Sequence, residues 1–388
     1  MRIAFYTPLV PLSHPRISGD VVIARNLVEA LRRQGHDVWV LPDLSTETAI
    51  GSLRGALRIP GALAKIHRAA RAIRPEVWLT CYCDSLAPDL PGVVLAHGLG
   101  ARYVIYGAVK RGGSGGRRPR LQGAIINRLA LRAADHVIVN KTRDLDGLAR
   151  HPWLRGKLSL LRPAVSTAEF RRDPIKRERT RRGLGIAAGA VVLLAAARLT
   201  YRGGGRKVES LRFLIESVAA LQRPASEVLL VIAGEGKARR ELEEHSASLR
   251  DRVRFIGGIP HAEMSSLYGA ADIFCYPGLR EPIGMVYLEA QASGLPIVAF
   301  RSGGIPEVVR DGETGFLVPR LDGPAFTARL NELIADRPLR DRLGDAGIAH
   351  VLANHDLDGW GSALTGLLEG GSAGAGSGNR PRNPLADS

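Results

Sequence analysis

The chain begins with the sequence RIAFY at residues 2–6, VVIARNLVEALRRQG at residues 21–35 and VWVL at residues 38–41. The two short apolar runs are typical of buried strands. Between them, Ile23, Leu27 and Leu31 recur at helical spacing, and Gly35 provides a C-terminal stop. These features predict a helix over residues 21–34 between two strands, which is the repeating unit of a parallel sheet covered by helices.

The same alternation continues along the rest of the chain. In the first half, further strands are predicted at residues 77–80, 93–96 and 137–139. In the second half, strands are predicted at residues 191–196, 228–233, 253–256, 273–276 and 296–300. A basic stretch over residues 163–182, in which we expect little regular structure, separates the two series. We therefore expect two Rossmann-like α/β domains, with a cleft where the carboxyl ends of their strands face each other.

Length and composition agree with two globular domains. The chain has 388 residues, of which 45% are hydrophobic and 24% charged. No apolar run approaches the roughly 20 residues that span a bilayer, and the first residues resemble a strand rather than a signal peptide. We therefore expect a cytoplasmic location.

Cys81, Cys83 and Cys275 are too few and too scattered for a disulfide framework or a four-ligand zinc site. The net charge of +16 leaves nucleic acid, anionic membrane and phosphorylated ligands open as partners.

The most informative local sequence is REPIGMVYLE at residues 280–289. Pro282 suits the first turn of a helix, so we expect Glu281 just before the helix and Glu289 about a turn and a half inside it. At about 1.5 Å per residue, the two carboxylates would lie roughly 10 Å apart, with free amides near Ile283 and Gly284 between them. Such amides suit a diphosphate, and the carboxylates suit the hydroxyl groups of a sugar and a ribose. Two solvated helix glutamates explain the spacing equally well.

A long stretch of the second half resembles the retaining glycosyltransferases of family 4, which have the two-domain GT-B fold. It contains VRFIGGIPHAEMSSLYGAADIFCYP at residues 253–277, then the glutamate pair, then GLPIVAFRSGGIPEVVRDGETGFLVP at residues 294–319. The ISGD sequence at residues 17–20 and AARL at residues 196–199 agree with the same family. The resemblance covers nearly the whole chain.

This resemblance implies a division of labour between domains. Residues 1–165 would form an acceptor-binding domain and residues 166–352 a nucleotide-sugar-binding domain, with a helix over residues 353–369 returning to the first domain. Residues 370–388 are rich in Gly and Ser and are expected to form a disordered tail. The implied activity is the transfer of a hexosyl group, with retention of anomeric configuration, from a nucleotide sugar to a hydroxyl acceptor. Its product would be a glycolipid, a polysaccharide or a glycosylated metabolite.

The resemblance also assigns the donor-binding residues. It implies that Glu281 contacts hydroxyl groups of the donor sugar and that Glu289 binds the ribose. Arg198 matches the arginine of a basic pair that binds the donor diphosphate. Lys207 is the best match to the lysine of that pair. Because the loop before it is longer than usual, Arg202 and Arg206 remain alternatives.

Glycines complete the predicted donor site. Gly19 matches a glycine that lets the backbone approach the donor phosphates, and Gly234 follows a strand at the same edge of the cleft. Plain turn formation explains Gly234 equally well. The family often has two adjacent glycines where this chain has Gly19 and Asp20. We expect Asp20 to cap the first helix.

His97, in VVLAHGLG at residues 93–100, is expected to end a first-domain strand that faces the cleft. It matches a catalytic position near the reacting carbon, and a structural histidine is the alternative. No first-domain carboxylate stands out as the nucleophile of a double displacement. We therefore expect a front-face reaction, in which the leaving phosphate accepts the proton of the acceptor while Arg198 and Lys207 stabilise it. No metal ion and no cofactor other than the nucleotide sugar are expected.

Two basic segments bear on the acceptor. KRGGSGGRRPR at residues 110–120 has five basic residues in a Gly-rich loop, which suits an anionic or lipid-linked acceptor. The amphipathic basic run at residues 54–74 suits peripheral contact with an anionic membrane. Solvated surface explains both segments equally well.

Two other classes of function remain open at this stage. A non-transferase on the same fold, such as a nucleotide-sugar epimerase or an inactive relative, would have a similar sequence. A basic nucleic-acid-binding protein would explain the net charge. However, the basic residues are dispersed and only 5% of residues are aromatic, so nucleic acid is not the expected partner.

Overall fold

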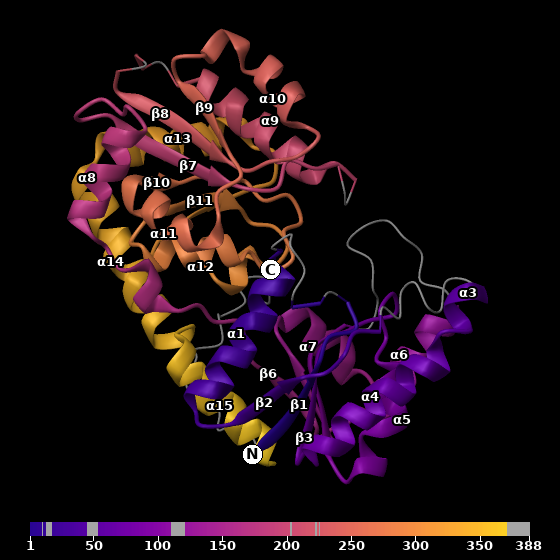
Figure 1. Ribbon diagram of the computed structural model, residues 1–388. Helices are drawn as coiled ribbons and strands as arrows, with labels where there is room; N and C mark the ends of the chain where they lie inside the picture. Colours follow the sequence, from indigo (N-terminus) through magenta and orange to yellow (C-terminus); the bar gives the residue numbers. More distant parts are fainter. Residues whose placement is uncertain are drawn as a thin grey trace, which may run out of the picture.

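The computed structural model describes residues 1–9, 11–12, 18–44, 53–109, 121–201, 204–221, 223–224 and 226–370. Their strands form two six-stranded sheets in which every pairing is parallel (Figure 1). The prediction of two Rossmann-like α/β domains is therefore confirmed. The basic loop at residues 110–120, Arg202 and the tail after Gly370 lie outside the described residues.

The first sheet is built from the N-terminal part of the chain. Its strands are β1 (Arg2–Tyr6), β2 (Asp37–Val40), β3 (Val77–Cys83), β4 (Arg102–Ala108), β5 (His136–Val139) and β6 (Leu158–Leu160). Its helices are α1 (Gly19–Arg33), α3 (Leu53–Ala56), α4 (Ile59–Ile73), α5 (Leu90–Leu95), α6 (Leu121–Ala133) and α7 (Thr142–Ala149), with short turns η1 (His97–Leu99) and η2 (Pro152–Leu154). The strand order β2-β1-β3-β4-β5-β6 places the topological switch point between β1 and β3.

The second sheet has the order β12-β11-β10-β7-β8-β9. These strands are β7 (Val191–Ala196), β8 (Val228–Ala233), β9 (Val253–Gly257), β10 (Ile273–Phe274), β11 (Ile297–Phe300) and β12 (Gly315–Val318). Its helices are α9 (Arg206–Ala219), α10 (Arg239–His245), α11 (His261–Ala270), α12 (Met285–Ala292), α13 (Gly323–Ala335) and α14 (Arg337–Asn354), with turns η4 (Ala247–Leu249) and η5 (Ile305–Glu307). The switch point lies between β7 and β10.

Burial explains why these sequences form strands. All six residues of β8 and all four of β5 are buried, because helices cover both faces of each sheet. Cys81, Cys83 and Cys275 are free and buried. The helix predicted at residues 21–34 is confirmed as α1, and Gly35 has φ 79° just after its end. None of the described helices is long and apolar enough to cross a bilayer.

The strand predicted at residues 93–96 is wrong, because these residues belong to the end of α5 and the turn that follows it. The Asp89 side chain accepts a hydrogen bond from the Gly92 amide at 2.7 Å and caps the helix, and Pro91 suits its first turn. The strand that occupies this place in the sheet is β4, which the sequence prediction missed.

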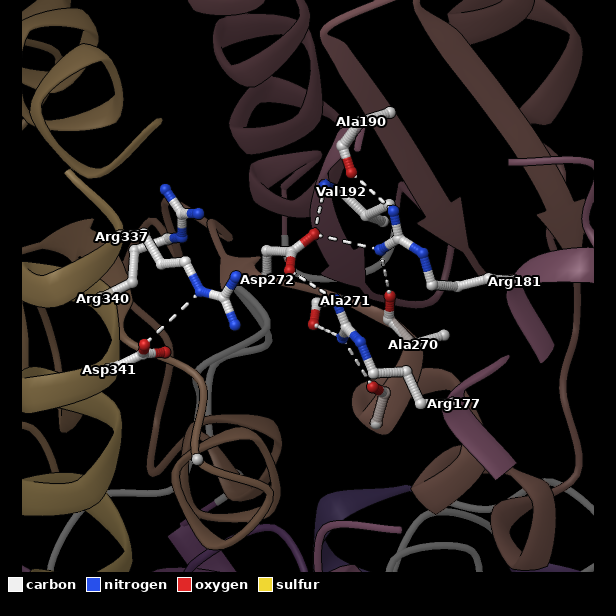
Figure 2. A network of polar contacts seen from close by, with 12 residues as sticks. Arg177, Arg181, Ala190, Val192, Ala270, Ala271, Asp272, Arg337, Arg340 and Asp341 are labelled. Atoms are coloured by element: carbon white, nitrogen blue, oxygen red, sulfur yellow. Dashed lines mark hydrogen bonds and ion pairs between the residues drawn. The ribbon is translucent and has the colours of Figure 1, made fainter. Parts of the chain in front are cut away.

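The expectation of little regular structure at residues 163–182 is also wrong. This stretch contains the turn η3 (Thr167–Phe170) and the helix α8 (Pro174–Gly183). The Asp173 side chain caps α8 by accepting hydrogen bonds from two amides at 3.0 Å. Arg177 and Arg181 donate hydrogen bonds to the Asp272 carboxylate and to backbone carbonyls at the end of α11 (Figure 2). The arginines of this stretch therefore fasten α8 to the second sheet, and the charge pattern alone did not reveal the helix.

The two halves are joined twice. In Figure 1 they lie one above the other, and α14 and α15 (Leu357–Glu369) run down one side from the upper half to the lower. The linker after β6 meets the start of α15, where the Val165 amide donates to the His355 carbonyl at 2.9 Å. The Trp360 indole N–H donates to the Arg162 carbonyl at 2.6 Å. Further along, α15 packs against α1, so the C-terminal helix lies on the first domain.

Candidate functional site

Glu281 lies at the carboxyl end of β10, in the loop that leads to α12. Neighbouring elements hold this loop through its backbone. The Leu279 amide donates to Ser210 Oγ of α9 at 3.0 Å, and the Arg280 amide donates to Ser302 Oγ at 2.9 Å. The Glu281 carbonyl accepts a hydrogen bond from the Gly304 amide at 2.8 Å. The backbone that carries the Glu281 carboxylate is therefore fixed at the switch point of the second sheet.

The helix after Glu281 begins at Met285 rather than at Pro282, so the predicted start is wrong. Gly284 has a left-handed backbone with φ 79°. A Cβ atom there would lie 2.3 Å from the Tyr287 ring, so tertiary packing delays the helix. Glu281 consequently precedes α12 by four residues. Ile283 and Gly284 lie just before the first amides of α12, and whether these amides bind an anion stays a prediction.

Two cations from the second domain act on Glu281. Arg198 is an exposed residue just after β7, and Lys207 lies in the first turn of α9. Burial raises the pKa of the partly buried Glu281 carboxyl, whereas the charges of Lys207 and Arg198 lower it. Arg206 is the first residue of α9, beside Lys207. The structure thus brings Glu281, Arg198 and Lys207 to one edge of the sheet.

Two glycines allow the Arg198 loop to take its course. A Cβ atom on Gly234, φ 151°, would lie 1.9 Å from the Ala197 carbonyl oxygen. A Cβ atom on Gly236 would lie 2.1 Å from the Leu199 carbonyl oxygen. The backbone on both sides of Arg198 therefore packs directly against these glycines. This close packing explains why position 234 is a glycine.

Glu289 lies on α12 and is 4% exposed. Its Oε2 accepts a hydrogen bond from the Tyr268 hydroxyl of α11 at 2.8 Å. Burial raises its pKa, while His261 and Tyr268 lower it. A carboxylate has about four acceptor positions, and this bond uses one of them.

The first domain faces these groups with the amino end of α1. A Cβ atom on Gly19 would lie 3.9 Å from Met285 Cγ, so the amino ends of α1 and α12 approach each other across the cleft. The expectation that Asp20 caps α1 is wrong, since Ser18 is the N-cap and accepts from the Val21 amide at 3.4 Å. Asp20 lies in the first turn, where the charges of Arg198 and Lys207 act on it.

His97 lies at the opposite edge of the first sheet, which contradicts its predicted place in the cleft. It begins η1, before β4, and its exposed side chain lies with Nε2 3.2 Å from Asp135 Oδ2. Asp135 immediately precedes β5, so this pair lies at the amino ends of the strands. The error has the same cause as the misassigned strand at residues 93–96. A role for His97 at the reacting carbon is therefore withdrawn.

Glu307 of η5 contacts the first domain and was not predicted. Its carboxylate accepts hydrogen bonds from the Thr142 amide at 2.9 Å and the Thr142 hydroxyl at 3.0 Å, and it pairs with Arg162 Nε at 2.9 Å. The contact joins the two domains, from the loop after β11 to the start of α7. It was missed because SGGIPE at residues 302–307 gave no sign of a partner 165 residues away in the chain.

Within the described part of the chain, His, Cys, Asp and Glu side chains form no group of three or more that could hold a metal ion.

Comparison with known proteins now identifies the family. Residues 176–350 match the family model described as glycosyl transferases group 1. This segment of the chain belongs to that family. The chain is 30% identical to the D-inositol 3-phosphate glycosyltransferase of Streptomyces avermitilis, over 76% of this chain and 64% of that protein. It is 36% identical to the GDP-mannose-dependent alpha-(1-6)-phosphatidylinositol monomannoside mannosyltransferase of Mycolicibacterium smegmatis, over 55% of this chain and 56% of that protein. The match spans less than two thirds of the length of either relative.

Solved structures agree at the level of the fold. The crystal structure of Anabaena HepE in complex with UDP has a TM-score of 0.74 at 18% identity, covering 95% of this chain and 100% of that chain. Sucrose-phosphate synthase from Thermosynechococcus elongatus has a TM-score of 0.70 at 20% identity, covering 95% and 98%. The chain therefore has the GT-B fold, as predicted. These likenesses give no support to the epimerase or nucleic-acid alternatives.

Proposed function

We propose that this protein is a retaining glycosyltransferase that moves a hexosyl group from a nucleotide sugar to a hydroxyl acceptor. The observation that carries the proposal is the position of Glu281, between the amino end of α12 and the cations Arg198 and Lys207, at the switch point of the second sheet. Open α/β sheets bind ligands at such points. The relatives support a nucleotide-sugar donor, since one of them is named for its use of GDP-mannose.

In the proposed complex, the donor lies along α12. Arg198, Lys207 and the first amides of α12 bind the diphosphate, because all three offer hydrogen-bond donors or positive charge to an anion. Glu281 accepts hydrogen bonds from hydroxyl groups of the transferred sugar, and Glu289 accepts them from the ribose. Gly234 keeps the Arg198 loop in place, and Gly19 leaves room for the donor phosphates beside α1.

The proposed mechanism is a front-face substitution. The bond between the anomeric carbon and the diphosphate oxygen breaks with its electron pair on the phosphate, and the acceptor oxygen bonds to the same face of that carbon. The acceptor proton passes to the leaving phosphate, whose charge Arg198 and Lys207 offset. Because these cations supply the charge balance, we propose that transfer needs no metal ion and continues in EDTA.

For the acceptor we propose a hydroxyl compound that carries a phosphate or a lipid. The names of the relatives support this class, since they include inositol 3-phosphate and phosphatidylinositol monomannoside.

We also propose that one face of the first domain contacts anionic membrane. The helices α4, α5 and α6 lie on the same side of the first sheet (Figure 1). On this side, α4 has the exposed basic residues Lys65, Arg68 and Arg71. The helix α6 has exposed apolar residues at every fourth position, namely Leu121, Ile125 and Leu129. Such a surface suits a bilayer interface. Sedimentation with vesicles that contain phosphatidylglycerol at low salt tests this contact, with phosphatidylcholine vesicles as the control. Equal sedimentation with both vesicles, or with neither, would contradict it.

Nucleotide release tests the proposed activity. With GDP-mannose or UDP-glucose as donor and D-inositol 3-phosphate or phosphatidylinositol vesicles as acceptor, we expect nucleotide release to rise when acceptor is added. Glu281→Gln should abolish that increase with little change in thermal stability. Glu332→Gln, at an exposed carboxylate of α13 that pairs with Arg329, is the matched control. Wild-type turnover in Glu281→Gln would contradict the assignment.

A further inference from the structure

The first sheet has a switch point of its own, between β1 and β3. Gly19, at the start of the helix after β1, lies close to Met285 at the start of α12 in the second domain. The segment that follows β1 leads to Gly19 and Asp20 at the start of α1. The end of β3 contributes Tyr82, and Asn140 follows β5. None of these polar side chains has a place in the proposed donor site.

Tyr82 has a strained backbone. Its φ of 64° is left-handed, which is uncommon for a bulky residue, and strained residues of this kind cluster at functional sites. The strain is accommodated by Gly107 of β4, where a Cβ atom would lie 2.9 Å from the Tyr82 ring. The Tyr82 hydroxyl is buried beside the Asp20 carboxylate, with which it interacts, and it has no other hydrogen-bond partner among the described residues.

Asn140 adds a second buried polar group at the same edge. It is 2% exposed, and its Nδ2 has no hydrogen-bond partner among the described residues. The same Cβ atom on Gly107 would lie 3.6 Å from Asn140 Nδ2, so Tyr82 and Asn140 flank Gly107 at the ends of three adjacent strands. A buried amide without a partner destabilises the fold, so a site that keeps one is suited to a polar ligand.

Asp20 lies between this edge and the donor-binding cations. Ser18 already caps α1, so the Asp20 carboxylate is not needed for that purpose. The charged and titratable groups that face Asp20 come from both domains: Arg198, Lys141, Asp84, Lys207, Cys81, Tyr82 and Glu281. Burial raises the pKa of Asp20, and the three cations lower it.

We propose that Asp20 binds the acceptor, by accepting a hydrogen bond from the hydroxyl group that receives the sugar, while Tyr82 and Asn140 donate hydrogen bonds to neighbouring oxygens of the same molecule. The inference rests on the proposed transferase function and adds the acceptor side of the site. It assigns a polyhydroxylated ligand to the first-domain switch point, because a carboxylate, a phenol hydroxyl and an unpaired amide side by side match alternating hydroxyl groups. The hydroxyl bound by Asp20 faces the cations that hold the leaving diphosphate, as transfer requires.

Kinetics of Asp20→Asn test this assignment, with Glu29→Gln on the exposed side of the same helix as the matched control. We expect Asp20→Asn to lower kcat/KM for D-inositol 3-phosphate about 10- to 100-fold, the effect of losing one hydrogen bond to a charged group. Hydrolysis of the donor, in which water takes the place of the acceptor, should slow by a similar factor. The affinity for nucleotide sugar should stay within about twofold of wild type, and the acidic limb of the pH-rate profile should shift.

Three outcomes would overturn the inference. Unchanged donor hydrolysis and unchanged acceptor KM in Asp20→Asn would show that Asp20 does not bind the acceptor. An equal loss of nucleotide-sugar affinity would place Asp20 in the donor site. A loss of thermal stability that Asp20→Ser shares would make its role structural. Failure of the proposed function itself would look different, because the wild-type protein would then neither bind nor hydrolyse a nucleotide sugar.

Discussion

At the scale of single residues, the candidate site combines two carboxylates with two cations. Glu281 and Asp20 come from different domains, and each carboxylate lies within the influence of the same two cations, Arg198 and Lys207. Burial raises the pKa of both carboxyls, and the cations oppose it. Removal of a cation therefore affects both sides of the site.

Arg198→Ala should weaken binding of GDP or UDP about 10- to 100-fold, because a guanidinium makes charge-assisted hydrogen bonds to phosphate oxygens. Calorimetric titration with the nucleotides measures this loss. Arg240→Ala, at an arginine of α10 whose side chain is 90% exposed, is the matched control and should bind nucleotide normally. Undiminished binding by Arg198→Ala would remove Arg198 from the donor site.

Asp89 is a residue-scale determinant of stability away from the cleft. Its fully buried carboxylate accepts from the Gly92 amide and the Tyr103 hydroxyl, each at 2.7 Å, and from Thr80. Asp89→Ala leaves these donors buried without a partner, so we expect the free energy of unfolding to fall by about 2–4 kcal/mol. Urea denaturation measures the change, and Asp146→Ala on the exposed face of α7 serves as control. A change below about 1 kcal/mol would contradict this account.

At the scale of elements, the Arg198 loop depends on Gly234. Any side chain there would collide with the Ala197 carbonyl, so Gly234→Ala should move the loop that carries Arg198. We expect weaker nucleotide binding together with a lower melting temperature, both measured by thermal shift with and without GDP. Gly269→Ala on α11, where nothing lies within 4 Å of the added Cβ, is the control. Normal nucleotide binding by Gly234→Ala would mean that the loop adapts.

Elements also show how far sequence patterns determine this fold. The strands β7 and β8 match their predicted bounds because each is a continuous apolar run of strand length. The run at residues 93–96 was misassigned because periodicity cannot separate a short buried helix from a strand. The start of α12 was misplaced because Gly284 adopts a left-handed backbone under the Tyr287 ring, a tertiary contact that no local pattern contains.

The candidate site follows the same rule. Glu281 was predicted from its place before a helix and from the family resemblance. Arg198 and Lys207 were assigned through that resemblance alone. The predicted position of His97 was wrong because it depended on the misassigned strand at residues 93–96. Asp20 was given the wrong role because both Ser18 and Asp20 suit an N-cap, and only the folded geometry shows which one accepts the amide. Tyr82, Asn140 and Glu307 could not be found, since their significance lies in partners distant in the chain.

At the scale of the whole molecule, Glu307 fastens the two domains. Glu307→Ala removes the hydrogen bonds to Thr142 and the ion pair with Arg162, so the cleft should open more often. We expect a larger radius of gyration in small-angle X-ray scattering without ligand, and donor binding that restores the wild-type value. Glu313→Ala, at a carboxylate that pairs locally with Arg310, is the control. Identical scattering from Glu307→Ala and wild type would show that other contacts hold the halves together.

The junction between the domains should also make stability depend on pH. Burial lowers the pKa of His350 and of His355 to about 4, and nearby Arg310 and Arg162 act in the same direction. A histidine whose folded pKa is depressed stabilises the fold fully above its unfolded pKa, near 6.5, and loses that contribution as pH falls toward 4. We expect the free energy of unfolding to drop by up to about 1.4 kcal/mol per pH unit for each histidine.

Urea denaturation at pH 7, 6 and 5 measures this dependence. His355→Asn should flatten it, because one of the two titrating groups is gone. His67→Gln, at a histidine of α4 far from the junction, should leave the slope unchanged. A wild-type protein equally stable at pH 7 and pH 5 would contradict the assignment.

The double connection between the halves limits the ways in which they can move. A single linker would leave three rotations free, as in a ball joint. Here two chain segments run side by side and are tied by the hydrogen bond from the Val165 amide to the His355 carbonyl. Two connected segments restrict rotation of one domain against the other about the linker. The motion that they leave is bending about a single axis. Whenever the two domains approach each other, the carboxyl ends of the same strands should therefore meet in the same relative orientation.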